Sequence, residues 1–445
     1  MTRVAVTEAV LSWAVERSGL PLANLHRRFP RLDEWQRGDA RPTLRQLEDF
    51  AKATATPLGF LFLDRPPAEQ LPIPHFRTVR EAVPRRPTAD LLETVHTMQR
   101  RQAWLREYLV EDGYEPLPFV SSAQHTDSPS DVAAQIRLAL DLTEAWAEES
   151  PTWTDALRRL RSVVENAGIL VAASGIVGNN TRRKLDVDEF RGFVLVDPYV
   201  PLVFVNAADA RAAQMFTLAH ELAHIWFGSS AAFDLRDLQP APDAMEQICN
   251  RTAAEFLVPE QRLRELWPIA RQDPEPFQAI ARSFRVSVLV AARRALDLRL
   301  IGQPQFQDFY RAYLEDERRR AARTQEGGGD FYATQMLRVG RRFGRAALRA
   351  VKEGRLLYRE AYDLTGLYGE TFDKFAAGLD QPRGDERPCC LCARCERFHR
   401  SCPQILCVRP GSQILDDPGT ACAGRSRPQR GSCQPRAGQR SRSPG

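Results

Sequence analysis

The hydrophobic positions along this chain of 445 residues change their spacing twice. Up to about residue 167 they recur every three or four residues, which is the period of amphipathic helices. Short apolar runs that suit β-strands follow at 169–172, 193–196 and 202–205. Helical spacing then returns and continues to residue 378. The pattern therefore predicts a mostly helical α+β chain with one small sheet.

Four short helices with brief turns between them are predicted in the first 65 residues. We expect them at 6–18, 21–28, 31–37 and 43–53. Thr43, which follows a proline, is the expected N-cap of the fourth helix. Short helices in this arrangement are typical of a helix-turn-helix bundle.

The composition is that of a soluble globular protein, with 43% hydrophobic and 27% charged residues. No stretch approaches 18 consecutive apolar residues, so we expect no membrane span. The N-terminal segment carries Glu8 and Glu16 within its apolar pattern and has no cleavage-site signature. It is therefore not a signal peptide, and we expect a cytoplasmic protein.

The last 66 residues, 380–445, differ from the rest of the chain. Twelve arginines and six acidic residues give them a balance of +6, so the preceding 379 residues, the body, carry −1 of the total +5. Eight of the nine cysteines also lie in this tail. Cys392-x-x-Cys395, with His399 and Cys402 nearby, is compatible with a zinc knuckle but lacks a second cysteine pair and an apolar core. We favour a disordered or frameshifted tail.

Two histidines and a glutamate stand in the most apolar of the predicted helices, residues 209–227. Within FTLAHELAHIWF, His220, Glu221 and His224 form the sequence H-E-x-x-H. A spacing of four places both imidazoles on one helix face, where they can take two corners of a zinc tetrahedron. Glu221 lies about 100° round the helix, so it borders the metal without binding it. The alternative is a pair of hydrogen-bonded core histidines beside a salt-bridged glutamate.

A third ligand is needed, because catalytic zinc takes three protein groups and a water molecule. No further histidine follows in the body, which favours a carboxylate from the helix predicted at 243–257. Glu246 is the preferred ligand, and Asn250, one turn later on the same face, would hold a ligand imidazole in its tautomer. Glu255 is the rival, but nine residues at about 100° each place it on the opposite side of the helix. Cys249 is assigned to the core.

These residues predict hydrolysis of a peptide bond. A zinc ion on His220, His224 and Glu246 would activate a water molecule and polarise the scissile carbonyl. Glu221 would take the proton of that water and pass it to the leaving amine.

Two further features of the reaction stay open. A donor to the developing oxyanion is expected, and Arg211 and Asn206 are both close to the motif in sequence. The strand predicted at 202–205 is expected to offer an edge to which a substrate peptide adds as an extra strand.

Five stretches of the body follow a common pattern. They are Phe216-Thr-Leu-Ala-His220-Glu221-Leu-Ala-His224, Glu246-x-x-Cys-Asn250-x-x-Ala253-Ala254-x-x-Leu-Val-Pro259, Trp35-x-x-Gly38-x-x-x-Pro42-Thr43, Arg191-Gly-Phe193 with Pro201 and Val205-Asn206, and Phe284-x-Val286-Ser287-x-x-Val290-x-x-Arg293-Arg294. Together they resemble the ImmA/IrrE family of zinc metallopeptidases, in its longer form with an N-terminal Xre-like helix-turn-helix domain. Thr252 stands where the family usually has phenylalanine, a difference in packing rather than chemistry.

The resemblance implies a gluzincin-like domain with Zn²⁺ as its cofactor. It also implies cleavage of a partner repressor, itself a helix-turn-helix protein, which would release silenced genes in a stress response or a mobile element. The segments expected from pattern and resemblance together are 1–65, the helix-turn-helix bundle; 66–150, a helical linker region; 151–268, the zinc metallopeptidase core; 269–305, a helix-turn-helix-like segment; 306–379, a C-terminal helical region; and 380–445, the tail.

The alternative function is that of a DNA-binding transcriptional regulator whose zinc domain senses or stabilises. The N-terminal bundle carries Arg28, Arg31, Arg37 and Arg41, which could contact DNA phosphates. The same arginines could instead solvate one face of the bundle or dock a protein. Glu221 favours the peptidase, because a structural zinc site has four protein ligands and no use for a carboxylate beside the metal.

Overall fold

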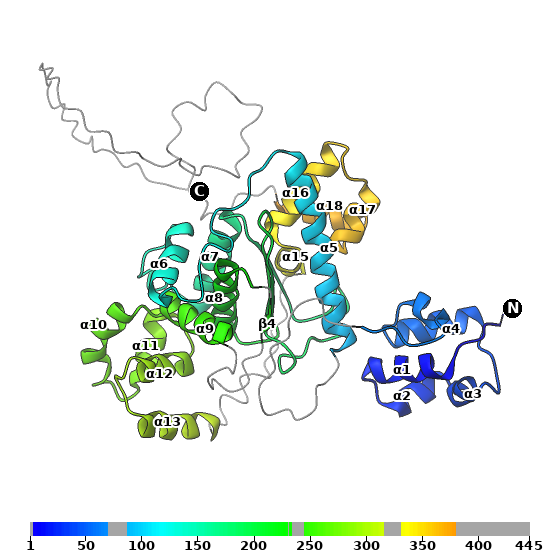
Figure 1. Cartoon of the computed structure of the whole chain (residues 1–445), viewed down its shortest axis with the longest axis horizontal. Helices are drawn as coiled ribbons and strands as arrows, with labels where there is room; N and C mark the ends of the chain where they lie inside the picture. Colours follow the sequence, from blue (N-terminus) through cyan, green and yellow to red (C-terminus); the bar gives the residue numbers. More distant parts are fainter. Residues whose placement is uncertain (1–2, 70–86, 230, 234–243, 316–330, 380–445) are drawn as a thin grey trace, which may run out of the picture. The chain divides into compact units, whose positions relative to one another are not determined.

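Short helices at the N-terminus form a bundle with a core of its own. The computed structural model describes residues 3–69, 87–229, 231–233, 244–315 and 331–379 (Figure 1). The bundle consists of α1 (Glu8–Ser18), α2 (Leu22–Arg28), α3 (Leu32–Arg37), α4 (Leu44–Ala53) and the 3-10 helix η1 (Leu58–Phe62). The four helices predicted from the sequence are confirmed, each to within two residues at either end.

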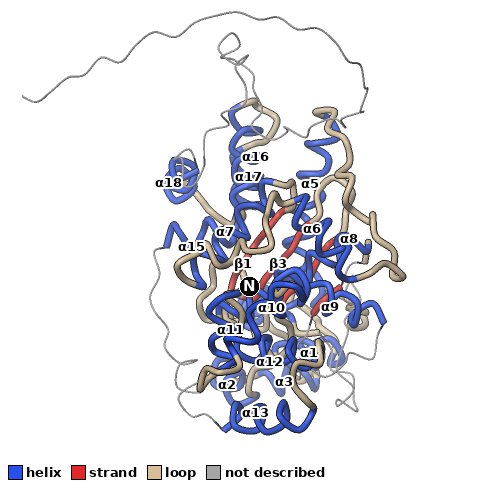
Figure 2. The backbone as a smooth tube through the Cα atoms, turned by 90° about the vertical axis from the view of Figure 1, so that its left-hand side faces the viewer, coloured by secondary structure: helices blue, strands red, loops and turns tan. Residues whose placement is uncertain are grey.

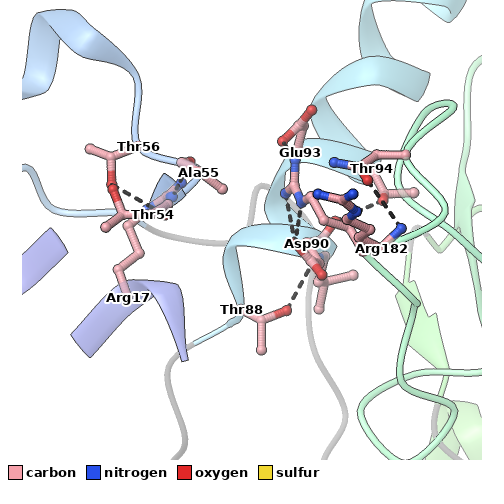
Figure 3. Close-up of polar contacts among 12 residues, drawn as sticks. Arg17, Thr54, Ala55, Thr56, Thr88, Asp90, Glu93, Thr94 and Arg182 are labelled. Atoms are coloured by element: carbon pink, nitrogen blue, oxygen red, sulfur yellow. Dashed lines mark hydrogen bonds and ion pairs between the residues drawn. The ribbon is translucent and has the colours of Figure 1, made fainter. Parts of the chain in front are cut away.

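Aromatic side chains fill the centre of this bundle. The rings of Phe29 and Phe50 meet edge to face with centroids 5.4 Å apart, and Trp35 also meets Phe50 edge to face. Contacts of this kind add to the free energy gained by burying the rings themselves. Arg17 on α1 donates a hydrogen bond to the carbonyl oxygen of Ala55 at 2.6 Å, which fastens the first helix to the turn after α4 (Figure 3).

The rest of the described chain is mostly helical with one small sheet, as predicted. Its helices are α5 (Ala89–Glu111), α6 (Pro129–Ala139), α7 (Trp153–Asn166), α8 (Arg211–Phe227), α9 (Ala244–Leu257), α10 (Glu260–Ala270), α11 (Pro276–Phe284), α12 (Val288–Asp297), α13 (Gln303–Glu315), α15 (Phe331–Val339), α16 (Arg341–Lys352), α17 (Tyr358–Thr365) and α18 (Glu370–Leu379). Its strands are β1 (Leu170–Ser174), β2 (Gly192–Leu195), β3 (Leu202–Asn206) and β4 (Ala231–Phe233). The helix that the pattern extends over 129–148 ends at Ala139, close to Asp141, whose φ of 53° is not helical.

The sheet has the strand order β1-β3-β2-β4, in which β1 and β3 are parallel and the other pairs antiparallel. The three predicted strands are present, and β4 is an addition that the sequence did not suggest. Val203 in β3 pairs with Val171 on one side and with Val194 on the other. The expectation that 202–205 offers a free edge is therefore wrong, because both edges of β3 are already hydrogen-bonded.

Side chains of the central strands alternate between two hydrophobic cores. Val171, Val203 and Val205 point to one core, which contains α6 to α12. Their neighbours Leu202 and Phe204 point to the other core, with α5 and α15 to α18. In Figure 1, α7 and α8 accordingly lie on one side of the sheet and α5 on the other. Both faces of the sheet are covered, which explains why its strands are apolar at nearly every position.

Helix α5 joins the sheet to the C-terminal helices (Figure 2). The side-chain amide of Gln102 donates to the carbonyl oxygens of Leu195 and Val200, at 2.8 Å in both cases. Arg101, which is buried, donates to the carbonyl oxygen of Arg338 at 2.7 Å. The predicted linker region thus contributes a helix to the core on this face, and α6 packs against α8 and α9 on the other.

Several predicted features lie outside the described residues. They include residues 316–330 of the predicted C-terminal helical region and the whole of the tail with its cysteines. Among the helices that are described, none combines the length and the hydropathy that crossing a bilayer requires.

Thr43 caps α4 as predicted, and replacing it tests the stability of the bundle. Its hydroxyl oxygen accepts from the backbone N–H of Gln46 at 3.3 Å, and the Gln46 side chain accepts from the N–H of Thr43 at 2.9 Å. We expect Thr43→Ala to lower the free energy of unfolding by about 1 kcal/mol, measured by hydrogen exchange in α4. Thr43→Ser keeps the oxygen and should keep most of the stability. Equal losses in both variants would contradict the role of the cap.

Candidate metal centre

Helix α8 is buried at every position from Gln214 to Trp226. It follows β3 after a short turn, packs against β2, β3 and α7, and lies beside α9 (Figure 1). A helix that is apolar on all its faces belongs in a core, and this one carries the H-E-x-x-H sequence. Each ionisable group that it holds away from water therefore needs a compensating partner.

Three of these side chains meet at one point. The Nε2 atoms of His220 and His224 are 3.0 Å apart. Glu246 lies in the first turn of α9, with its Oε2 3.2 Å from Nε2 of His220 and its Oε1 3.2 Å from Nε2 of His224. The candidate ligand atoms all lie within 4.8 Å of one another, and the three side chains are buried. The structure thus brings the three predicted ligands together in a cluster that could hold a metal ion.

The protonation states of the cluster suit a cation. Burial lowers the pKa of His220, although Glu246 acts in the opposite direction, so the neutral imidazole is favoured. Burial raises the pKa of Glu246, but the two imidazoles lower it by more, so its carboxyl group stays ionised. Metal binding requires neutral imidazole and ionised carboxylate. Two nitrogen donors and one carboxylate oxygen are a ligand set that zinc accepts, so the residues fit the ion that the sequence predicts.

Glu221 lies beside the cluster and is not a member of it. Its side chain is completely buried, and neither carboxyl oxygen has a hydrogen-bond partner among the described residues. Burial raises the pKa of Glu221 well above its ordinary value, and the charge of Glu246 acts in the same direction. Burying a carboxyl group without a hydrogen-bond partner destabilises the folded state, because no local contact compensates for the lost hydration. Such a group is expected at a site of chemistry rather than in a plain core.

The side chain of Glu221 packs over Gly192 in β2. A Cβ atom on Gly192 would lie 3.2 Å from Oε1 of Glu221, 2.5 Å from Cγ2 of Thr217 and 2.8 Å from the carbonyl oxygen of Phe204. Only glycine leaves room there for α8 to approach the sheet. The role of Gly192 was not predicted, although a glycine inside a strand signals a close approach of this kind.

Of the remaining candidates on α9, Asn250 is the one whose side chain affects a ligand. Its side chain raises the pKa of His220, although its Oδ1 is outside hydrogen-bonding geometry. Glu255, the rival ligand, instead forms an ion pair with Arg294. Cys249 is buried in the core.

Neither candidate for the oxyanion donor reaches the cluster. Asn206 is buried at the end of β3, where its amide donates to the carbonyl oxygen of Phe190 at 3.1 Å and its Oδ1 accepts from the N–H of Ala208. Arg211 is exposed at the first residue of α8, about 15 Å along the helix axis from Glu221. Neither Asn206 nor Arg211 is therefore identified as the oxyanion donor.

The four arginines singled out in the N-terminal bundle are exposed. Arg31 pairs with Glu34 at 2.6 Å, and Arg37 pairs with Asp39 at 2.8 Å. The guanidinium of Arg28 lies over the ring of Phe29. Two of the four positive charges are therefore balanced by acidic neighbours, while Arg41 has no described ion-pair partner.

Comparison with known proteins bears on the same part of the chain. Residues 164–296 match the family model described as the IrrE N-terminal-like domain, which is a peptidase family. This match supports the resemblance of these residues to the ImmA/IrrE family. It runs from the end of α7 into α12 and contains the three candidate metal ligands and Glu221. Residues 339–378 match a domain of unknown function (DUF8813), and no curated protein matches the chain. The N-terminal bundle lies outside both matches.

Metal analysis of variants tests the cluster. We expect the full chain to retain about one zinc ion after dialysis and to lose it in His224→Gln and Glu246→Gln, because two remaining ligands hold the ion poorly. Glu221→Gln and Glu255→Gln should keep the ion, since neither side chain belongs to the cluster. Elemental analysis by mass spectrometry gives the ratio. Loss of zinc in Glu255→Gln but not in Glu246→Gln would reverse the assignment.

Proposed function

We propose that the protein is a zinc-dependent endopeptidase. Glu221 is the observation that carries this proposal, because it is a buried carboxyl group that has no hydrogen-bond partner among the described residues and lies beside three candidate ligands. A structural zinc site would have a fourth protein ligand, and the cluster among the described residues has three. The family match over residues 164–296 supports the same reading.

In the proposed reaction, His220, His224 and Glu246 hold a zinc ion that, when bound, acidifies a water molecule and polarises the scissile carbonyl. Glu221 accepts one proton as the water oxygen bonds to the carbonyl carbon. It returns a proton to the amine nitrogen as the C–N bond breaks. The close packing of Gly192 under Glu221 fixes the carboxyl group in the position from which it transfers both protons.

The proposed substrate is a partner repressor of the helix-turn-helix class, whose cleavage would derepress genes. This part of the proposal rests on the resemblance to the ImmA/IrrE family.

The second candidate function, a DNA-binding regulator, depends on the N-terminal bundle. Its short helices α2 and α3, joined by a brief turn, are compatible with a helix-turn-helix. The acidic partners of Arg31 and Arg37 reduce the positive charge available for phosphates. We therefore place DNA binding second, as a property that could accompany proteolysis.

Replacing Glu221 separates the two functions. Purified full chain and its Glu221→Gln variant are incubated with a candidate helix-turn-helix repressor from the same genome, and cleavage is followed by mass spectrometry. We expect the variant to be slower by about 10²- to 10⁴-fold, because it cannot accept a proton. If both forms leave that protein whole while the wild type binds a DNA site tightly at physiological salt, the regulator is the better account.

Gly192→Ala tests the packing beneath Glu221. The added methyl group would collide with Thr217 and shift Glu221, so we expect proteolysis to fall by about 10²-fold while zinc is retained. Thr217→Ser in the same chain removes the Cγ2 atom and should restore part of the rate. Gly59→Ala, where nothing lies within 4 Å, is the matched control. Full activity in Gly192→Ala would contradict the positioning role.

A further inference from the structure

A cavity lined by several arginines lies among α7, β1, the start of α8 and the helices α15 and α16, and none of the candidate metal ligands lines it. Helix α15 packs against β1 (Figure 2), and α7 packs against both β1 and α8. The cavity has a volume of about 230 Å³ and is lined by Arg158, Arg161, Arg211 and Arg341. Glu165 is the one carboxylate among its described lining residues. Of these four arginines, Arg161 and Arg211 form no ion pair with a described carboxylate, whereas Arg158 is paired with Asp155.

Arg161 on α7 is the innermost of these groups, with 8% of its surface exposed. Its Nη2 donates to the side-chain oxygen of Gln214 at 2.7 Å, while its Nε has no hydrogen-bond partner among the described residues. It forms no ion pair with any described carboxylate, although a buried charge ordinarily requires one. A donor is therefore left unused inside the cavity.

The other arginines increase the positive charge instead of neutralising it. Burial lowers the pKa of Arg161 to about 10, and the like charge of Arg211 acts in the same direction, while the charge of Glu165 acts in the opposite one. Arg211 is exposed and has no ion pair among the described residues, whereas Arg158 is paired with Asp155 at 3.0 Å. Glu165 already accepts a hydrogen bond from the backbone N–H of Arg342 at 3.2 Å. An anion in the cavity would relieve the repulsion between Arg161 and Arg211.

We propose that this cavity binds a small ligand through a phosphoryl group, with Arg161 and Arg211 as its principal contacts. Guanidinium groups bind phosphate oxygens through paired, charge-assisted hydrogen bonds. The volume is below that of pockets for drug-sized ligands, which suits inorganic phosphate or the phosphate monoester of a small metabolite and excludes a nucleic acid duplex.

The bound ligand would affect how the start of α8 is held against the neighbouring elements. Gln214, which accepts from Arg161, also donates to the carbonyl oxygen of Asp209 at 2.7 Å, in the turn that leads into this helix. Asp209 pairs in turn with Arg191, the residue before Gly192. The cavity is thus connected by hydrogen bonds to both elements that position Glu221, and binding itself does not depend on peptidase activity.

Calorimetric titration of the full chain tests the proposal, with inorganic phosphate, glycerol phosphate, succinate and sodium chloride at matched ionic strength. We expect phosphate or glycerol phosphate to bind, and Arg211→Gln to weaken that binding by about 10- to 100-fold. Arg211 is the residue of choice because it is exposed, so its replacement leaves the core intact. Arg359→Gln, an exposed arginine on α17, is the matched control and should bind as the wild type does.

Each result decides the matter. Tighter binding of glycerol phosphate identifies a phosphorylated metabolite, and equal or tighter binding of phosphate identifies the free ion. Stronger binding of succinate would overturn the phosphoryl assignment. Absence of binding, or equal weakening in Arg211→Gln and Arg359→Gln, would overturn the site itself.

Discussion

The structure depends on how the ionisable side chains of the buried helix α8 are compensated by neighbouring groups. Helix α8 carries two imidazoles and a carboxyl group through the middle of a core, at a cost that hydrophobic packing alone would not repay. The carboxylate of Glu246 meets both imidazoles, but it leaves Glu221 without a partner. A divalent cation bound by His220, His224 and Glu246 would stabilise the carboxylate of Glu246. It would also place a water molecule beside Glu221, which could then accept its proton.

The surrounding fold serves to hold α8 in this place. The sheet presents one face to α8 and the other to α5 and the C-terminal helices, so both cores contact the strands β1, β2 and β3. Gly192 lets the helix come close, and the hydrogen bonds from Arg161 through Gln214 to Asp209 fix its start. Catalytic geometry of this kind is more exact on packed helices and strands than on loops.

Local features of the chain could be predicted from the sequence, and non-local ones could not. Helix limits followed from caps and spacing, as Thr43 illustrates, and helical geometry preferred Glu246 to Glu255, which the structure places in an ion pair with Arg294. The free edge expected for the strand at 202–205 was wrong, because the pairing of β3 with β1 and β2 joins segments far apart in the chain. The sequence of the predicted linker region, 66–150, likewise indicates only a run of helices. Only the structure shows that α5 packs into one hydrophobic core and α6 into the other.

The central claim is that a zinc ion sits among His220, His224 and Glu246, and anomalous X-ray diffraction at the zinc absorption edge tests it most directly. The account predicts a single strong peak about 2.0–2.2 Å from one nitrogen of each imidazole and from a carboxylate oxygen of Glu246. Density without an anomalous signal at this position in crystals grown with zinc, or a peak confined to the tail cysteines, would contradict it.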